Sequence, residues 1–477
     1  MTPPPSPAVE GGAAAAAAGH GGRERHVLLF PLPYQGHINP MLRLAGVLRA
    51  RGFAVTVFHT HFNAPDAARH PEHRFVAVPD GMSGARPPPV SVGDVVKHIR
   101  ALNAACEAAF RDRLAAVLAE YSRDAVACLV ADAHLLRMVE VARRLAVPTL
   151  VLRTGSAACF ASFLAYPLLC DKGYLPVQES SQLDMPVSEL PPYRVRDLMH
   201  IGRDGHELMC ELLARAVAAV KLSSGLILNT FDALEAPELA KLRRDLAVPV
   251  FDIGPLHRFS PAADGSLLHQ DRSCLAWLDA QAAESVLYVS FGSLASMGAR
   301  ELVETAWGIA GSGVPFLWVV RPGLVRSRRA APDEPTRLLL PEGFEAATRR
   351  RGVVVAWAPQ EEVLRHRAVG GFWTHSGWNS TTESLAEGVP MLCRPSFGDQ
   401  MGNARYVEHV WKAGFEVGGE LERGAVEAAI RRLMAESDGG EMRARARDLK
   451  KAAAECTGKA GSSETAIVKM VTHMLSL

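Results

Sequence analysis

The sequence predicts an α/β protein with two domains, each built on a parallel β-sheet. Short apolar runs alternate with longer amphipathic stretches from residue 23 to residue 256, and a second alternation begins near residue 286. This alternation is typical of β-α-β units, in which helices cover a parallel sheet. The length of 477 residues also exceeds what one ordinary core requires, so more than one domain is expected.

Five short apolar runs in the first half are predicted as buried strands. The helix after the first run is expected to begin at Asn39 as N-cap, with Pro40 at the first helical position, and to end before Gly52. The loops that follow parallel strands meet at one edge of the sheet, where ligands bind. The predicted strands cover residues 26–32, 53–60, 125–131, 147–154 and 225–231.

The second half repeats the pattern after a polar stretch at 257–272, which is predicted as a linker between domains. We therefore expect an N-terminal domain at 23–256, a C-terminal domain at 273–457 and a final helix at 458–477 that packs back toward the N-terminal domain. Residues 324–337 are expected to form a surface loop. The predicted strands cover residues 286–293, 315–321, 352–357, 369–375 and 389–394.

Composition excludes several classes of function. Lys and Arg number 52 against 51 acidic residues, so neither nucleic acid nor an anionic membrane is expected as a partner. No run of about 18 uncharged apolar residues predicts a transmembrane helix. Eight scattered cysteines show no metal-ligand spacing, which favours free thiols in the cytoplasm and no metal. Residues 1–22 lack the features of a secretory signal and are expected to be a disordered tail.

The first chemical candidate is His37, which follows the first predicted strand at the start of a helix. A helix N-terminus disfavours the protonated imidazole, so this side chain is suited to accept a proton. Asp132 ends another apolar strand and could fix the tautomer of His37 and stabilise its protonated form. The alternatives remain that His37 only fills the turn and that Asp132 only caps a helix. No Gly-x-Ser-x-Gly elbow and no Gly-x-Gly-x-x-Gly fingerprint accompanies them, which argues against a serine hydrolase and a nicotinamide enzyme.

A second candidate region begins at Trp357 and Ala358. Trp357 follows a strand and precedes Ala-Pro, so its indole could stack on a planar ring while the backbone of Ala358 bonds that ring's edge; core packing is the alternative. Farther on, His375, Asn379 and Ser380 surround a predicted helix start, where free N–H groups suit a phosphate.

Other residues of this region have a structural and a functional interpretation. Ser380 and Glu383 could form a capping box, or Glu383 could accept from a vicinal diol. Asp399 could be only an N-cap, or Asp399 and Gln400 could bind the hydroxyl groups of a sugar. These features together fit a nucleoside-diphosphate sugar: a face for a planar ring, an acceptor for a diol, a phosphate site and groups that bind sugar hydroxyls.

Residues 357–400 resemble the signature box of plant family-1 UDP-dependent glycosyltransferases. PLPYQGHINPML, GLILNTFDALE and SVLYVSFGS also stand in that family's order. DKGYLPV and ELPPYRVRDL are most similar to the branch that contains grass benzoxazinoid glucosyltransferases and related cytokinin or terpenoid enzymes. The resemblance implies the GT-B fold, with an acceptor-binding N-terminal domain and a UDP-sugar-binding C-terminal domain facing across a cleft. It also implies an inverting enzyme of plant secondary metabolism that uses UDP-glucose as co-substrate and needs no cofactor or metal.

The resemblance assigns roles to named positions. His37 would be the general base and Asp132 its orienting partner. The remaining residues would contact the donor: Trp357 and Ala358 the uracil, Gln360 and Glu383 the ribose, His375, Asn379, Ser380 and Ser293 the diphosphate, and Trp378, Asp399, Gln400 and Thr154 the sugar.

Sugar and acceptor choice are less constrained by the resemblance. In the family, glutamine at the position of Gln400 accompanies glucose, whereas Arg153 stands where many members carry an aromatic or apolar residue. A monomer is expected. The alternatives are an enzyme that uses another UDP-sugar, an enzyme that transfers to a nitrogen or sulfur nucleophile, and a non-catalytic nucleotide-sugar binder. The acceptor pocket could include Tyr34, His134, Phe160 and Phe163, although core packing is the alternative for each.

Overall fold

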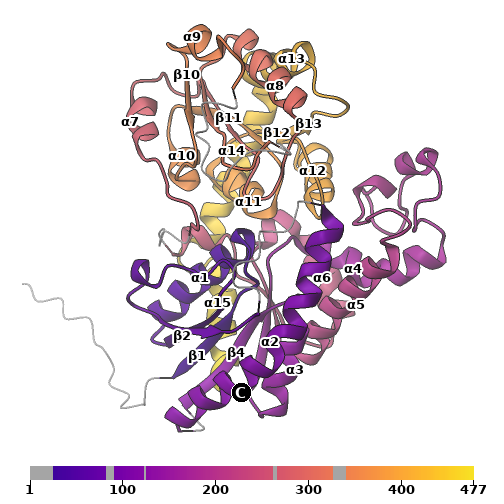
Figure 1. The fold of residues 1–477 in the computed structure, drawn as a ribbon, viewed down its shortest axis with the longest axis vertical. Coiled ribbons are helices and arrows are strands. Elements are labelled where there is room, and N and C mark those ends of the chain that lie inside the picture. Colours follow the sequence, from indigo (N-terminus) through magenta and orange to yellow (C-terminus); the bar gives the residue numbers. More distant parts are fainter. Residues whose placement is uncertain (1–24, 82–90, 123–124, 261–265, 326–339) are drawn as a thin grey trace, which may run out of the picture.

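The computed structural model describes residues 25–81, 91–122, 125–260, 266–325 and 340–477. These residues form two parallel sheets, which confirms the predicted α/β class. Figure 1 shows the sheets in two lobes, the N-terminal lobe below and the C-terminal lobe above. The predicted tail at 1–22 and most of the predicted loop at 324–337 lie outside the described residues.

The N-terminal lobe is built on a seven-stranded sheet in the order β3-β2-β1-β4-β5-β6-β7, with every neighbouring pair parallel. The apolar runs predicted as strands lie in its interior because helices cover both faces. Its strands are β1 (His26–Phe30), β2 (Ala54–Thr60), β3 (Arg74–Val78), β4 (Val126–Asp132), β5 (Thr149–Arg153), β6 (Leu226–Leu228) and β7 (Val250–Asp252). Its helices are α1 (Gln35–Ala50), α2 (Val92–Glu120), α3 (Leu136–Arg144), α4 (Ala157–Asp171), α5 (His206–Leu222) and α6 (Asp232–Asp245), with 3-10 turns at Ala67–Arg69, Ser180–Asp184, Val195–Asp197 and Leu256–Arg258.

The C-terminal lobe contains a six-stranded sheet in the order β10-β9-β8-β11-β12-β13. Its strands are also paired in parallel. They are β8 (Val286–Ser290), β9 (Phe316–Val319), β10 (Gly352–Val355), β11 (Val369–Thr374), β12 (Met391–Cys393) and β13 (Gly414–Glu416). The helices of this half are α7 (Ser273–Asp279), α8 (Ala299–Ser312), α9 (Phe344–Thr348), α10 (Gln360–Arg365), α11 (Trp378–Glu387), α12 (Gln400–His409), α13 (Arg423–Ala435), α14 (Ser437–Thr457) and α15 (Ser462–Ser476).

Each of the ten predicted strands overlaps an observed one, but β3, β7 and β13 were not predicted. All three lie at a sheet edge and are at most five residues long. β7 and β13 have only three residues each, too few for a recognisable apolar run, and β3 begins with an exposed arginine and is mostly half-buried.

The start of α1 differs from the prediction. The helix begins at Gln35 rather than at Asn39, Tyr34 is its extended N-cap, and Pro40 lies inside it. Proline has no N–H, so the helical hydrogen bond from residue 40 to the carbonyl of Gly36 cannot form. The side chain of Asn379, in the opposite lobe, donates to that carbonyl at 3.0 Å. A partner from distant sequence therefore compensates for the proline.

The C-terminal helix α15 packs on the N-terminal sheet. Ile467 and Met470 are fully buried in the same core cluster as Val27 of β1. Ser463 Oγ donates to Gly254 O at 2.6 Å, and His473 Nε2 lies 2.8 Å from Ser224 O. No helix in the described part of the chain is both long and apolar enough to cross a membrane.

Candidate active site

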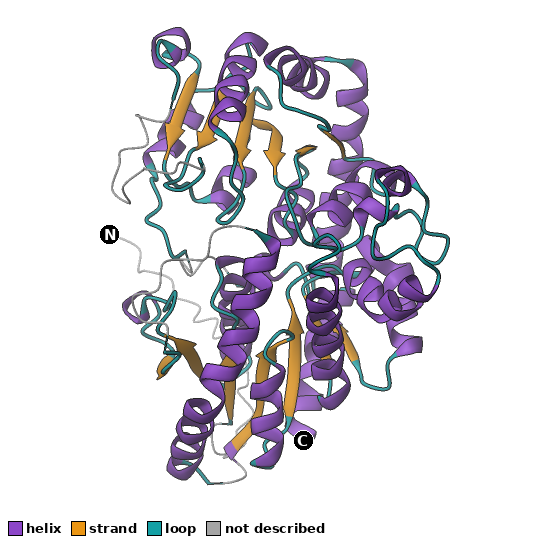
Figure 2. Cartoon of the chain, turned by 45° about the vertical axis from the view of Figure 1, so that its right-hand side comes forward, coloured by secondary structure: helices purple, strands orange, loops and turns teal. Residues whose placement is uncertain are grey.

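A cavity of about 600 Å³ lies between the two lobes. In Figure 2 the carboxyl ends of the strands in the two lobes point toward each other, so the loops that follow them form both walls. Most of the residues predicted for the site line this cavity: Tyr34, His37, His134, Thr154, Ser293, Trp357, Ala358, Gln360, His375, Trp378, Asn379, Ser380, Glu383, Asp399 and Gln400.

His37 and Asp132 form a hydrogen-bonded pair beneath the cavity. Nδ1 of His37 lies 2.6 Å from Oδ2 of Asp132 and 2.9 Å from Oγ1 of Thr154. Both contacts are made by the same ring nitrogen, so Nε2 of His37 is the nitrogen available to a ligand. The histidine side chain keeps 21% of its surface accessible, against 1% for the aspartate. This arrangement suits a base that a buried carboxylate orients.

Asp132 is held in its ionised form. Burial alone would raise the pKa of this carboxyl, but the charge and hydrogen bond of His37, together with groups of His134, lower it below its ordinary value. One of these groups is the His134 amide, which donates to Oδ1 at 2.9 Å. An ionised carboxylate at this position stabilises a proton on the imidazole.

His134 itself is a neutral side chain at the back of the cavity. Burial, with the nearby Arg153 guanidinium, lowers its pKa to about 3. Its ring lies 6.0 Å from the ring of His37, edge to face. The His134 imidazole is therefore unprotonated near neutral pH.

Trp357 stands at the mouth of the cavity, directly after β10. Its indole is half-buried and packs against the core, and Trp357 also lines the cavity. Its carbonyl accepts from the amide of Asp271 at 2.9 Å. Ala358 is 3% exposed and lines the cavity.

The capping-box interpretation of Ser380 and Glu383 is wrong. Helix α11 begins at Trp378 with Gly377 as N-cap, so Ser380 lies inside the helix. Nε2 of Gln360 instead donates to Oγ of Ser380 at 3.0 Å and to Oε2 of Glu383 at 2.7 Å. Burial raises the pKa of Glu383 above its ordinary value. Gln360 and Glu383 thus form one polar unit on the cavity wall.

His375 lies in a narrow space between two glycines. A methyl group placed on Gly292 or on Gly377 would come within 2.5 Å of Nε2 of His375, so no larger residue fits at either position without a shift. Gly292 also has a φ of +69°, which favours glycine. Burial, with the guanidinium of Arg321, lowers the pKa of His375 to about 4. A neutral imidazole therefore lies beside the free N–H groups at the start of α11.

Two residues predicted to contact the donor use their side chains elsewhere. The indole Nε1 of Trp378 donates to Asn229 O at 2.9 Å, and the ring is 3% exposed. The amide of Asn379 bonds Gly36, as described above. Their main-chain N–H groups at the start of α11 are the parts that remain for a ligand.

Asp399 and Gln400 lie where α12 begins. Oε1 of Gln400 accepts from the amides of Ser396 at 2.9 Å and Phe397 at 3.2 Å, which fixes the orientation of the side chain and leaves its NH₂ group as a donor. Oδ2 of Asp399 accepts from Asn403 at 3.3 Å. An NH₂ donor and a carboxylate acceptor stand side by side.

The remaining wall of the cavity is apolar and belongs to the N-terminal lobe. Leu32, Ile99, Met199 and Leu212 line it. Tyr34 lies there too, with its hydroxyl 2.5 Å from Nδ1 of His98. This wall suits a small apolar molecule with few polar groups.

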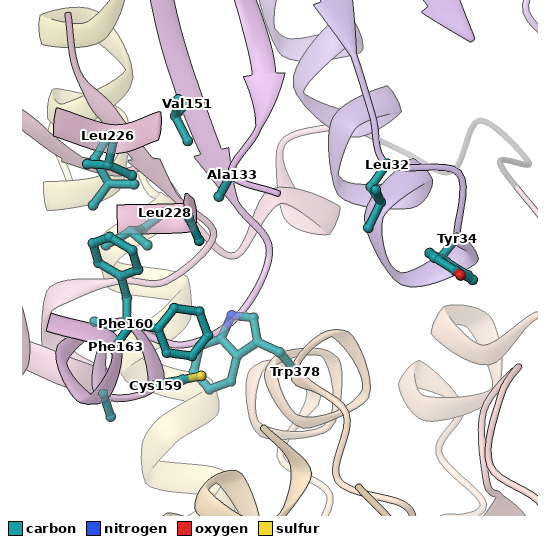
Figure 3. Close-up of a cluster of buried hydrophobic side chains, with 14 of the residues drawn as sticks. Leu32, Tyr34, Ala133, Val151, Cys159, Phe160, Phe163, Leu226, Leu228 and Trp378 are labelled. Carbon is teal, nitrogen blue, oxygen red and sulfur yellow. The ribbon is translucent and has the colours of Figure 1, made fainter. Parts of the chain in front are cut away.

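The prediction that Phe160 and Phe163 line the acceptor pocket is wrong. Both are at most 2% exposed, belong to the core, and are absent from the cavity wall. Figure 3 shows both rings beside Cys159, away from Leu32 and Tyr34. Helix α4 is apolar on every side, so periodicity could not tell its buried face from a cavity-facing one.

Arg43 was missed by sequence reasoning. It lies on α1 and forms an ion pair with Glu361 of the opposite lobe, and its charge acts on Glu383. Its position within an amphipathic helix resembles that of any surface arginine, so the sequence carries no signal for this contact.

Comparison with known proteins agrees with this geometry. A family model described as UDP-glucoronosyl and UDP-glucosyl transferase matches residues 37–441. The chain belongs to this family. It is therefore a glycosyltransferase that uses a UDP-sugar, and its two facing lobes are the GT-B fold, as the resemblance implied.

Several relatives of this glycosyltransferase are close over their whole length. It is 50% identical to the DIMBOA UDP-glucosyltransferase BX8 of Zea mays, over 94% of this chain and 98% of that one. It is 49% identical to the DIMBOA UDP-glucosyltransferase BX9 of the same plant, over 92% and 93%. Among solved structures, Phytolacca americana UGT2, complexed with UDP-2fluoro-glucose and pterostilbene, has a TM-score of 0.79 and 26% identity, over 95% of this chain and 100% of that one.

Proposed function

We propose that this glycosyltransferase moves glucose from UDP-glucose to a hydroxyl group of a small apolar acceptor, with inversion at the anomeric carbon. The observation that carries the proposal is the His37–Asp132 pair, 2.6 Å apart, at the base of a cavity with an apolar wall on one side and polar groups on the other. The names of the Zea mays relatives, both UDP-glucosyltransferases, support glucose.

His37 performs the proton transfer. Its Nε2 takes the proton from the acceptor hydroxyl as that oxygen attacks the anomeric carbon, and the bond from this carbon to the diphosphate oxygen breaks. The positive charge on the imidazole is offset by Asp132, and Thr154 helps to hold the ring. Attack from the side opposite the leaving group inverts the configuration.

The leaving diphosphate is stabilised by the start of α11. Main-chain N–H groups at Trp378, Asn379 and Ser380, with His375 and Ser293 beside them, bind its negative charge at the positive end of the helix dipole. Because these donors are fixed before the reaction, they favour the developing charge without reorganisation.

The rest of the donor follows the polar wall. Trp357 stacks on uracil and the backbone of Ala358 bonds its edge. Gln360 and Glu383, already joined at 2.7 Å, bind the ribose.

Gln400 is expected to select the sugar through its NH₂ group. Gln400→Glu keeps the oxygen that accepts from Ser396 and Phe397 but loses the donor, so kcat/KM for UDP-glucose should fall by about 10- to 100-fold. Steady-state kinetics with UDP-glucose, UDP-galactose and UDP-glucuronate in competition measure this. Wild-type preference for either of the latter two donors would contradict glucose selection.

Arg153 gives the sugar end of the cavity an unexpected positive charge. It is 5% exposed, its Cζ lies 4.9 Å above the ring of Phe163, and Nη2 is 3.5 Å from Sγ of Cys159. A methyl group placed on Gly155 would lie 2.8 Å from Nη2 of Arg153 and 3.2 Å from Oδ2 of Asp399, so both charges border one small space. A hydroxyl both accepts and donates, so a sugar hydroxyl that reaches both Arg153 and Asp399 can bridge the two side chains.

Arg153→Met keeps the apolar stem and removes the donor. We expect KM for UDP-glucose to rise by about 10- to 100-fold, with Arg153→Lys intermediate. Kinetics with UDP-glucose analogues that each lack one hydroxyl identify the bridge. For the analogue that lacks the bridging hydroxyl, Arg153→Met and wild type should have the same KM. If Arg153→Met raised KM equally for every analogue, the bridge would be excluded.

We also propose that the enzyme acts in the cytoplasm as a monomer. The eight cysteines are unpaired, which suits a reducing compartment, and one chain supplies both walls of the cavity. Mass-spectrometric screening of plant metabolites with UDP-glucose tests the activity and identifies the acceptor. UDP binding without turnover across such a panel would favour a non-catalytic binder, and transfer only to amines or thiols would favour the other nucleophile classes.

A further inference from the structure

Outside the cavity, two cysteines and a histidine come together where α4 ends and α5 begins. Nε2 of His206 lies 3.8 Å from Sγ of Cys170 and 3.4 Å from Sγ of Cys210. The three ligand atoms all lie within 4.8 Å of one another. Cys170 and Cys210 are half-buried, whereas the other six cysteines are buried, so these two are the thiols of the described chain that a solute can reach.

The two sulfur-to-nitrogen spacings match those between neighbouring ligands of a tetrahedral zinc ion. Zinc binds thiolate sulfur at about 2.3 Å and imidazole nitrogen at about 2.0–2.1 Å, which places neighbouring ligand atoms about 3.5–3.8 Å apart. The two sulfur-to-nitrogen distances, 3.8 and 3.4 Å, bracket this range. Both sulfurs lie within 3.8 Å of Nε2, and Sγ of Cys210 also lies 4.0 Å from Nδ1 of the same ring.

The histidine is oriented by its surroundings. The ring of His206 stacks on that of Tyr166 at a centroid distance of 6.2 Å and an angle of 26°. The hydroxyl of Tyr166 donates to the carbonyl of Met199 at 3.1 Å, which fixes the tyrosine. His206 and Cys210 are also four residues apart on one helix, a spacing that places both side chains on the same face.

We propose that Cys170, His206 and Cys210 bind a zinc ion with an open fourth position for water. Two thiolates and an imidazole are a soft ligand set that suits zinc and excludes magnesium and calcium. Binding releases the thiol protons, which is why affinity rises with pH. The sequence predicted no metal because Cys170 stands 36 residues before His206, too far apart for a recognisable ligand motif.

The ion would connect the two ends of residues 172–205, the segment drawn at the right of Figure 1. This segment carries Met199 of the apolar cavity wall, and Arg405 of α12 donates to its Pro192 carbonyl at 2.9 Å. Zinc would therefore hold α4 to α5 at the base of a segment that reaches both the cavity and the other lobe.

The test is zinc titration of the full-length protein, first stripped with a chelator and kept in a non-thiol reductant. Calorimetry should give one zinc per chain, and the thermal midpoint should rise with zinc. Cys170→Ser, Cys210→Ser and His206→Gln should each weaken binding by at least about 10-fold, because each removes one of three ligands. His200→Gln, a nearby half-buried histidine outside the cluster, is the matched control and should bind like wild type.

Cobalt supplies an independent readout that does not depend on activity. Substituted into the site, it should show the visible absorption of a tetrahedral thiolate complex, lost in Cys210→Ser. Zinc binding and stabilisation unchanged in all three variants would overturn the proposal, as would no binding by wild type. Neither result bears on the proposed glucosyl transfer, because none of the three residues lines the cavity.

Discussion

His37→Ala is expected to lower kcat for transfer to an alcohol by about 100- to 10,000-fold, while the dissociation constant for UDP changes less than about threefold. The variant loses Nε2, the nitrogen left free by the contacts to Asp132 and Thr154, but none of the groups at the start of α11 that are proposed to bind the diphosphate. Single-turnover kinetics and calorimetry with UDP separate the two effects.

The acidity of the acceptor supplies a control for this variant. A phenol of low pKa needs less help from a base than an alcohol, so its loss should be smaller, and added imidazole should restore part of the rate. Equal losses for both acceptors, with no rescue, would mean that His37 supports the fold rather than the proton transfer. If His37→Ala transferred glucose as fast as wild type, the natural acceptor would instead be an amine or thiol, which needs less help from a base.

Asp132→Asn is expected to lower kcat by about 100-fold or more with little change in KM for UDP-glucose. The asparagine has the same shape, but its NH₂ group would donate to Nδ1 of His37 and leave the proton on Nε2, where it blocks base action. Kinetics over a pH series and the affinity for UDP are the measurements. A large change in UDP affinity with kcat preserved would make the residue structural.

The same substitution has a signature in stability. Because the native pKa of Asp132 is lowered, its ionised form stabilises the fold above pH about 4 and this contribution is lost as the pH falls through the native pKa. Thermal midpoints of wild type and Asp132→Asn should therefore converge at low pH. A gap that stays constant from pH 7 to pH 3 would contradict the lowered pKa.

The sequence predicted those features that depend on local pattern. Central strands, buried on both faces, produce continuous apolar runs, and the candidates His37, Asp132 and Gln400 lie at strand ends or at the starts of the helices that follow. Features that depend on distant contacts were not predictable. Whether Phe163 lies in the core or the cavity depends on which side of α4 faces Arg153, and the pattern of an all-apolar helix does not contain that information.

Asn379 shows the same limit in another form. Its position at a helix start predicted a phosphate contact, but the side chain satisfies a carbonyl that Pro40 leaves without a partner in the other lobe. Two residues more than three hundred positions apart form one structural unit, and neither alone indicates the other.

That hydrogen bond connects the start of α11 to the residue next to His37. If the lobes separate to let UDP leave, the bond from Asn379 to Gly36, the residue next to His37, must break. Separation of the lobes would therefore also detach the start of α11 from the turn that carries His37.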